Sequence, residues 1–323
     1  MQAFAILAAL EPEPVNVDIY LPIAEMSVNV LTMIGLGVLV GFVSGLFGVG
    51  GGFLMAPVLV SLGIPPSVAV ASQAGHVLAT STSSVMSYSQ SDSVDYRMGA
   101  VMAAGGVVGA VIGVEIFRIL RLLGQIDLVV SLAYLLVLGS IGGMMLKESL
   151  TAMLLRRKGE APPRPKVKRP VWIYGLPFKM RFPRSGLYIS FIPPAAIGLL
   201  VGILSAMMGV GGGFLIVPAM IYILRMKASV VVGTSLFQIV ITTFVTMILQ
   251  AVRNHSVDMI LALILLAGGV IGGQAGIRMA NRFRADELRA IMAVIILMAG
   301  LQMGLSLFVP PQNPFVLVPT GQP

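Results

Sequence analysis

Gly48-Val49-Gly50-Gly51-Gly52-Phe53 decides the fold of this chain, because the same six residues return as Gly209-Val210-Gly211-Gly212-Gly213-Phe214. Each copy ends a long apolar run and begins a much shorter one. Consecutive glycines interrupt a helix, and a membrane tolerates an interrupted helix only where it is buried in protein or lines a cavity. Paired interruptions in the two halves of a chain are typical of the binding site of a transporter.

The composition indicates a membrane protein. Hydrophobic residues make up 57% of the chain, charged residues make up 11%, and the mean hydropathy is +0.97, whereas ordinary soluble domains are far more polar. We expect an all-α polytopic fold, because a helix satisfies its backbone hydrogen bonds within one segment. Runs of about 20 apolar residues, long enough to span a bilayer, lie at 26–47, 67–88, 97–118, 126–146, 187–207, 228–250, 257–279 and 289–308, and shorter runs follow the breaks at 53–63 and 214–224.

The two halves are repeats, and we expect them to be inserted in opposite orientations. Residues 26–147 and 187–308 each contain a broken pair of helices, one long and one short, followed by three long helices. Eleven of the 21 basic residues lie between Lys147 and Arg184, and the positive-inside rule places this segment in the cytoplasm. An inverted arrangement then leaves 18 basic residues inside and only three outside, namely Arg118, Arg121 and Arg253.

Three segments lie outside the repeats. Residues 1–25 are acidic and are expected in the periplasm, and residues 309–323 are expected to form a periplasmic tail. Residues 148–186 are basic and proline-rich, which favours a cytoplasmic linker near anionic headgroups, with binding of a regulator as the alternative. We therefore expect a multi-pass protein of the cell inner membrane. Whether the short helices re-enter the membrane or cross it stays open.

Glycines also recur at every fourth position in the third long span of each half. Small residues at this spacing leave a groove in which another helix can approach closely. We expect these residues to serve packing: Gly105, Gly109 and Gly113 in the first half, and Gly268, Gly272 and Gly276 in the second.

The second long span of each half carries polar side chains at a helical period. Hydroxyl groups in membrane helices usually donate back to their own backbone, but two matched stripes beside two matched breaks favour one shared cavity. The corresponding positions are Ser72 and Thr234, Gln73 and Ser235, His76 and Gln238, Thr80 and Thr242, and Ser84 and Thr246.

The chemistry of this cavity points to an anion. The breaks and the stripes contain no Asp or Glu, which a cation site inside a membrane normally has. Helix N-termini carry about half a positive charge and favour anions, and the short helices begin at Phe53 and Phe214. The predicted substrate-binding residues are Gly48, Gly50, Gly51, Gly52, Phe53, Ser72, Gln73, His76, Thr80, Gly209, Gly211, Gly212, Gly213, Phe214, Thr234, Ser235, Gln238 and Thr242.

Three acidic residues receive simpler interpretations, and His76 has two possible roles. Glu115 lies one turn from Arg118 and is expected to pair with it. Asp95 and Asp258 stand in matching Ser-Val-Asp segments, where helix capping explains them. His76 could couple transport to protons, since an imidazole titrates near neutrality, or it could be a neutral hydrogen-bonding group.

Several kinds of partner are disfavoured. The chain has no cysteine and two histidines, and without clustered carboxylates these argue against a metal centre. The net charge of +8 is concentrated in the linker, so we expect the lipid bilayer as a partner and no nucleic acid. No cofactor is expected.

At these residues the chain resembles the TauE/SafE family, also called the 4-toluene sulfonate uptake permease family. The resemblance rests on the doubled break, 44–52 and 205–213, followed by Pro57 and Pro218 and then by the helix starts Ala71-Ser72-Gln73 and Gly233-Thr234-Ser235. It extends over both repeats. It implies that the chain carries small sulfur-containing anions, such as sulfite, sulfoacetate, or aryl and alkyl sulfonates, across the cytoplasmic membrane.

We therefore expect a secondary transporter in which one repeat rocks against the other around the breaks, giving alternating access. An anion channel is the nearest alternative. An intramembrane enzyme is disfavoured, because the chain lacks a zinc motif, a Ser-His-Asp set and the lysine of a P-loop. The particular anion, the direction of transport, the coupling ion and the oligomeric state do not follow from the sequence.

Overall fold

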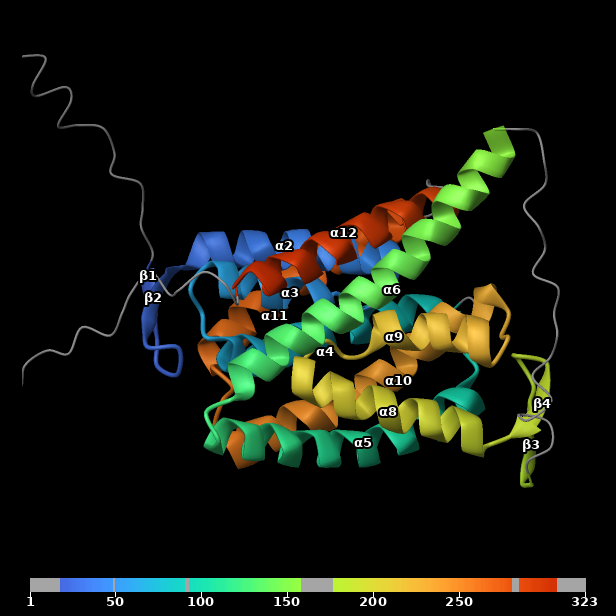
Figure 1. Cartoon of the computed structure of the whole chain (residues 1–323), viewed down its shortest axis with the longest axis horizontal. Coiled ribbons are helices and arrows are strands. Elements are labelled where there is room, and N and C mark those ends of the chain that lie inside the picture. Colours follow the sequence, from blue (N-terminus) through green and yellow to red (C-terminus); the bar gives the residue numbers. More distant parts are fainter. Residues whose placement is uncertain (1–17, 49, 91–92, 158–176, 281–284, 307–323) are drawn as a thin grey trace, which may run out of the picture.

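The structure, a computed structural model, describes residues 18–48, 50–90, 93–157, 177–280 and 285–306. In this part of the chain it contains ten α-helices, two short π-helical segments and two β-hairpins (Figure 1). Five of the helices are long and apolar enough to cross a membrane. The prediction of an all-α polytopic membrane protein is confirmed.

The elements of the two repeats follow one another in the same order, and each repeat begins with a β-hairpin whose first strand precedes the bounds predicted from the sequence. The first repeat contains β1 (Asp18–Leu21), β2 (Met26–Asn29), α2 (Val30–Phe47), α3 (Gly52–Ser61), α4 (Pro66–Gln90), α5 (Tyr96–Leu122) and α6 (Ile126–Arg157). The second contains β3 (Lys179–Phe182), β4 (Leu187–Ser190), α8 (Ile192–Met208), α9 (Gly213–Pro218) with its π-helical continuation η1 (Ala219–Ile223), α10 (Ala228–Leu249) with its continuation η2 (Gln250–Asn254), α11 (Met259–Ala280) and α12 (Ala285–Ser306). Every predicted apolar run contains a helix, but the prediction is wrong for residues 26–29 and 187–190, which form the strands β2 and β4 because each pairs with a preceding strand. The structure differs at α6, which continues into residues expected to belong to the linker.

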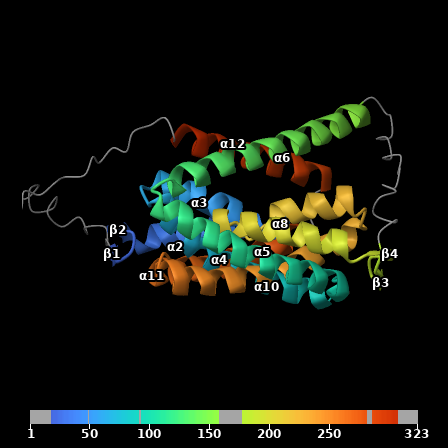
Figure 2. The same ribbon diagram turned by 60° about the horizontal axis from the view of Figure 1, so that its bottom comes forward.

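The two hairpins are features that the sequence analysis does not predict. Each joins two antiparallel four-residue strands, with Leu21 opposite Met26 in one and Phe182 opposite Leu187 in the other. Strands this short give little periodic signal beside long apolar runs. The hairpins lie at opposite ends of the molecule (Figures 1 and 2). This placement agrees with repeats of opposite orientation, although their orientation across a membrane stays a prediction.

Each broken helix pair turns back to the end of the molecule at which it began. Leu59 and Ile64, at and beyond the end of α3, pack in one core with Val28 of the first hairpin. In the second repeat, Leu224 packs in one core with Ile189 of the second hairpin. The glycine breaks are therefore the tips of two helical hairpins that enter the bundle from opposite ends.

The closest helix packing joins the two repeats. α5 of the first repeat packs along α8 of the second, and α11 of the second packs along α2 of the first. A methyl group added at Gly105 or Gly109 would lie 2.1 Å from a carbonyl oxygen of α8. One added at Gly272 or Gly276 would lie 2.0 or 2.1 Å from a carbonyl oxygen of α2. The predicted glycine grooves are confirmed, and each receives a helix of the opposite repeat.

Two buried carboxylates also connect the repeats. Asp95 and Asp258 each accept a hydrogen bond at 3.1 Å from the backbone N–H three residues later, which confirms the predicted helix caps. The second oxygen of Asp95 accepts hydrogen bonds from the N–H (2.9 Å) and the hydroxyl (2.6 Å) of Ser185. The second oxygen of Asp258 accepts one from the N–H of Ile23 (3.1 Å). Each repeat thus holds the hairpin of the other.

Helices α6 and α12 form an outer layer over the breaks. They pack against each other and cover one side of the bundle (Figure 2). Tyr134 of α6 and Met292 of α12 share a buried cluster with Phe53 and Phe214, the first aromatic residues after the two breaks. The breaks are consequently enclosed by α6 and α12 on one side and by α4 and α10 on another.

Candidate functional site

The two glycine breaks lie against each other. A methyl group added at Gly52 would lie 2.8 Å from both the Cα and the carbonyl oxygen of Val210. The rings of Phe53 and Phe214, both fully buried, have their centroids 6.1 Å apart. The short helices α3 and α9 therefore begin side by side, as expected from the sequence.

Neither of these helix starts has an acidic residue in its first turn. Gly51 and Gly212 occupy the N-cap positions of α3 and α9, and neither start has a side-chain cap. The N–H groups in the first turn of a helix have no acceptor within the helix itself. At these two starts the N–H groups of Gly52 and Leu54 donate to the carbonyl oxygens of Gly50 and Gly51 (2.9 and 3.2 Å), and that of Leu215 donates to Gly212 (3.0 Å). The two helix starts from opposite repeats therefore bring mainly the partial positive charge of their helix dipoles to the same small region.

Helices α4 and α10 contribute the remaining walls of this region. The side chains of Val77 and Ile239 lie between 2.5 and 3.7 Å from the positions that methyl groups at Gly50 and Gly211 would occupy. Each of these two side chains thus contacts both breaks. We call the region bounded by Gly50, Gly52, Val210, Gly211 and the facing residues of α4 and α10 the break junction.

Two hydroxyl groups border the break junction. Ser81 Oγ lies 3.1 Å from the methyl position at Gly50, and Thr243 Oγ1 lies 3.2 Å from the methyl position at Gly211. Both residues are buried, with exposed fractions of 0% and 1%. Neither oxygen has a hydrogen-bond partner among the described residues. The junction therefore offers two unused hydroxyl donors.

Sequence reasoning missed Ser81 and Thr243. They are separated by the same interval as the predicted pairs, and each directly follows a predicted residue, Thr80 or Thr242. One step along a helix turns the side chain by about 100°, toward a different neighbour. The matched hydroxyls were a usable signal, but periodicity alone cannot tell which neighbour a helix face meets.

Five other glycines belong to the breaks, and four of them pack against helices. A methyl group at Gly48 would lie 2.3 Å from Val232 Cγ1 of α10, and one at Gly209 would lie 2.1 Å from the carbonyl oxygen of Val70 in α4. Methyl groups at Gly51 and Gly212 would clash with α2 and α8, the helices that precede their own breaks. Gly213 is buried at the start of α9. These glycines allow the breaks to fit closely among their neighbours.

The first members of the polar stripes join the repeats. Ser72 Oγ accepts a hydrogen bond from the N–H of Asp258, and Thr234 Oγ1 accepts one from the N–H of Asp95, each at 2.9 Å. Ser235 donates to a carbonyl of its own helix. The structure therefore gives these three predicted residues contacts away from the break junction.

The middle members of the stripes face the glycine-rich helices. In α4, His76 and Thr80 lie against Gly269 of α11, at 2.4 and 3.0 Å from its methyl position. In α10, Gln238 and Thr242 lie against Gly106 of α5 in the same way. Thr80 also lies near the first break, since its hydroxyl is 3.5 Å from the carbonyl oxygen of Gly50. The substrate contacts of these four residues and the proton role of His76 stay predictions.

Gln73 holds the end of α8 at the second break. Its Nε2 donates to the carbonyl oxygen of Met208 (2.8 Å) and to the hydroxyl of Tyr134 (3.1 Å). The Tyr134 hydroxyl donates to the same Met208 oxygen (2.7 Å). Two side chains from the first repeat thus stabilise the last turn of α8.

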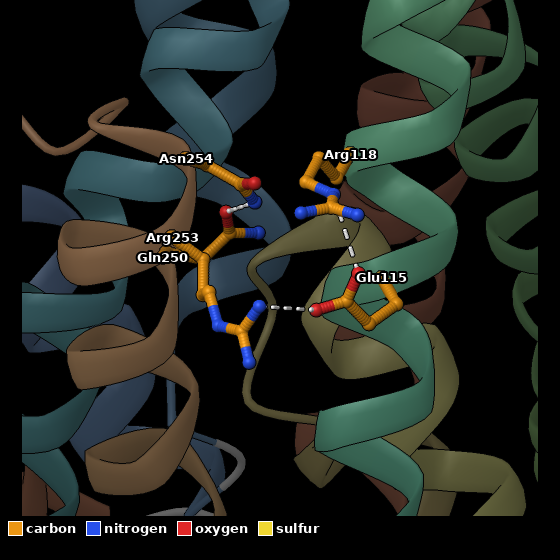
Figure 3. Close-up of polar contacts among 5 residues, drawn as sticks. All are labelled: Glu115, Arg118, Gln250, Arg253 and Asn254. Atoms are coloured by element: carbon orange, nitrogen blue, oxygen red, sulfur yellow. Dashed lines mark hydrogen bonds and ion pairs between the residues drawn. The ribbon is translucent and has the colours of Figure 1, made fainter.

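A charged cluster lies where α5 approaches η2 (Figure 3). Glu115 pairs with Arg118 (3.2 Å), as expected, and also with Arg253 (3.4 Å). Nearby, Gln250 accepts a hydrogen bond from Asn254 and donates to the carbonyl oxygen of Ala206 in α8 (3.0 Å). The predicted outer residues Arg118 and Arg253 therefore pair with the same carboxylate. The neighbouring Gln250 connects this cluster to the last turn of α8.

Comparison with known proteins identifies the family. The model of the family described as sulfite exporter TauE/SafE matches residues 33–303. The chain is 30% identical over 281 residues to the probable membrane transporter protein YjnA of Bacillus subtilis, covering 86% of this chain and 100% of that protein. It is 29% identical over 273 residues to a probable membrane transporter protein of Xylella fastidiosa, covering 83% and 92%. No solved structure matches. The chain therefore belongs to the sulfite exporter TauE/SafE family of membrane transporters.

Proposed function

We propose that this membrane transporter is a secondary carrier of small sulfur-containing anions, such as sulfite, sulfoacetate, or aryl and alkyl sulfonates. The observation that carries the proposal is the contact between the two uncapped breaks, Gly52 against Val210. Helix N-termini favour anions, and the break junction contains no Asp or Glu. The family match supports sulfite or a related anion as the substrate.

The packing supports a particular form of alternating access. Backbone contacts as close as those between α5 and α8, and between α11 and α2, allow little sliding. A rocking of one whole repeat against the other would separate both pairs. The moving bodies are instead the α2–α11 pair and the α5–α8 pair, each built from both repeats, with α4, α10 and the breaks between them.

In this proposal the protein lies in the inner membrane, with both termini in the periplasm. The charged cluster at Glu115 supports it, because Arg118 and Arg253 gather at one place as the charge count requires. The hairpins at opposite ends of the molecule give further support. Cysteines placed singly near Tyr20 and near Tyr188 of this cysteine-free chain test it, since only the first should react with a membrane-impermeant thiol reagent in intact cells.

Binding and transport assays test the substrate class. Purified protein is heated with sulfite, sulfate, thiosulfate, taurine, sulfoacetate or toluenesulfonate, with the chloride salt of the same cation as control. A ligand present at 100 times its Kd should add about 2.7 kcal/mol of stability. The best ligand is then labelled and its uptake into proteoliposomes measured. Absence of both stabilisation and uptake for all six anions would refute the proposal.

Counterflow separates a carrier from the alternative anion channel. Unlabelled substrate enclosed in the proteoliposomes should accelerate the uptake of labelled substrate by a carrier, because the loaded protein returns faster. A channel would show no such acceleration once the membrane potential is clamped.

A further inference from the structure

Most of the buried hydroxyl groups of α4 and α10 are engaged with protein atoms. Ser84 Oγ donates to the carbonyl oxygen of Thr80 (2.7 Å), and Thr246 Oγ1 donates to that of Thr242 (2.9 Å). Ser81 and Thr243 lie three residues earlier on the same helices and have no partner among the described residues. A buried hydroxyl group without a hydrogen bond destabilises a protein, so its presence at equivalent positions of both repeats calls for an explanation.

The hydroxyl of Ser81 does not bond to its own helix, although its neighbours do. The Thr80 hydroxyl lies 2.9 Å from the carbonyl oxygen of His76, and that of Thr82 donates to the carbonyl oxygen of Leu78 (2.7 Å). The hydroxyl of Ser81 instead lies beside Gly50, at the break junction. It is therefore available to a group that enters the junction.

Thr243 occupies the equivalent place in the second repeat. Its hydroxyl lies beside Gly211 as that of Ser81 lies beside Gly50. Because Val77 and Ile239 each contact both of these glycines, the two hydroxyls border one region from two sides. A single small guest at the junction would meet one hydroxyl from each repeat.

The chemistry of the two groups suits an anion. A hydroxyl can donate a hydrogen bond, whereas Gln73 Oε1 and Gln238 Oε1, which also lack a partner among the described residues, can only accept. The ring nitrogens of His76 and Nε of Arg225 lack a partner there too, but only Ser81 and Thr243 form a donor pair at equivalent positions of both repeats. Neutral donors also hold an anion less tightly than a guanidinium or ammonium group would. Carriage across a membrane requires such moderate binding, because the substrate must leave again.

We propose that the hydroxyl groups of Ser81 and Thr243 donate directly to the transported anion, one from each repeat, and so select small anions with several outward-facing oxygens. This inference rests on the proposed function. The predicted stripe residues His76, Thr80, Gln238 and Thr242 lie on a neighbouring face of the same two helices. In this inference Ser81 and Thr243, rather than those four residues, make the main side-chain contacts with the anion.

Matched substitutions test the inference. Ser81→Ala and Thr243→Val remove the two hydroxyls, and Ser84→Ala and Thr246→Val remove hydroxyls of the same kind that already have partners. We expect each junction variant to raise the Kd for sulfite, measured by thermal stabilisation, about 10-fold or more. The two control variants should change it less than about threefold. Ser81→Thr and Thr243→Ser keep a hydroxyl and should bind within about threefold of the unmodified protein.

The stability of the ligand-free variants supplies a second readout. Ser81→Ala and Thr243→Val remove no protein hydrogen bond and should unfold at or above the original temperature, whereas both controls should unfold below it. Sulfite affinities equal to that of the unmodified protein in both junction variants would overturn this inference and leave the proposed function standing. If none of the six anions binds the unmodified protein, both fall together. A lower unfolding temperature in both junction variants would show that the hydroxyls serve the fold.

Discussion

The two glycine breaks have the same six residues, but their neighbours hold them differently. At the second break, Gln73 and Tyr134 both donate to the carbonyl oxygen of Met208. At the first break, Ser235 stands where Gln73 stands in the other repeat, and it donates to Val232 in its own helix instead (2.8 Å). Identical residues therefore set the turn of the backbone, and dissimilar neighbours set how firmly the turn is held. We expect the second break to be the firmer of the two.

The largest contrast should come from placing alanine at the first glycine of each break. Gly48 and Gly209 both have positive φ, 64° and 69°, which costs alanine about 1 kcal/mol or more. At Gly209 the new methyl group would also lie 2.1 Å from a backbone oxygen, whereas at Gly48 it meets a valine methyl group. We expect Gly209→Ala to lose about 4 kcal/mol of unfolding free energy and Gly48→Ala about 2 kcal/mol.

Unfolding of purified protein in detergent mixtures with rising SDS content measures this contrast. Gly35→Ala is the control, because a methyl group there meets nothing within 4 Å. Equal losses at Gly48 and Gly209 would show that the backbone conformation alone, rather than the neighbours, decides the cost.

An intermediate effect should follow from Tyr134→Phe. The variant removes the hydroxyl that donates to Met208 (2.7 Å) and accepts from Gln73 (3.1 Å) while leaving the buried ring in place. We expect a loss of about 1–2 kcal/mol in unfolding free energy and faster hydrogen exchange at the end of α8. Tyr20→Phe, at a side chain that is 57% exposed, should change neither. Unchanged exchange in Tyr134→Phe would mean that this cap does not hold the second break.

The smallest effect concerns the two carboxylates that hold the hairpins. From the second hairpin, Asp95 accepts hydrogen bonds from both the N–H and the hydroxyl of Ser185, whereas the first hairpin gives Asp258 one hydrogen bond among the described residues, from the N–H of Ile23. Ala24 stands where Ser185 stands in the second repeat. We expect Ser185→Ala to lose about 1 kcal/mol of unfolding free energy and Ala24→Ser to lose none. A comparable loss in Ala24→Ser would show that the two ends are not built alike.

The sequence was sufficient for the features that depend on local chemistry. The apolar runs predict the helices, and the doubled glycines predict the breaks. The spacing of Gly105, Gly109 and Gly113 predicts a close helix contact. The identity of the partner helix could not be predicted, because the spacing of glycines indicates a groove but not which helix packs into it. The same limit explains the site. The spacing of His76 and Thr80 places them on one helix face, but nothing local to this helix indicates that α11 covers that face and that Ser81 lies beside the first break.

The exchange of helix partners bears on how the chain is made. α2 and α5 are synthesised before their partners, α11 and α8. Each therefore exposes a glycine-lined backbone until its partner has been made. The grooves of the first half therefore stay unfilled in the bilayer until the second half is inserted. Expressed alone, either half should be a target for membrane proteases, and co-expression of the two halves should protect both.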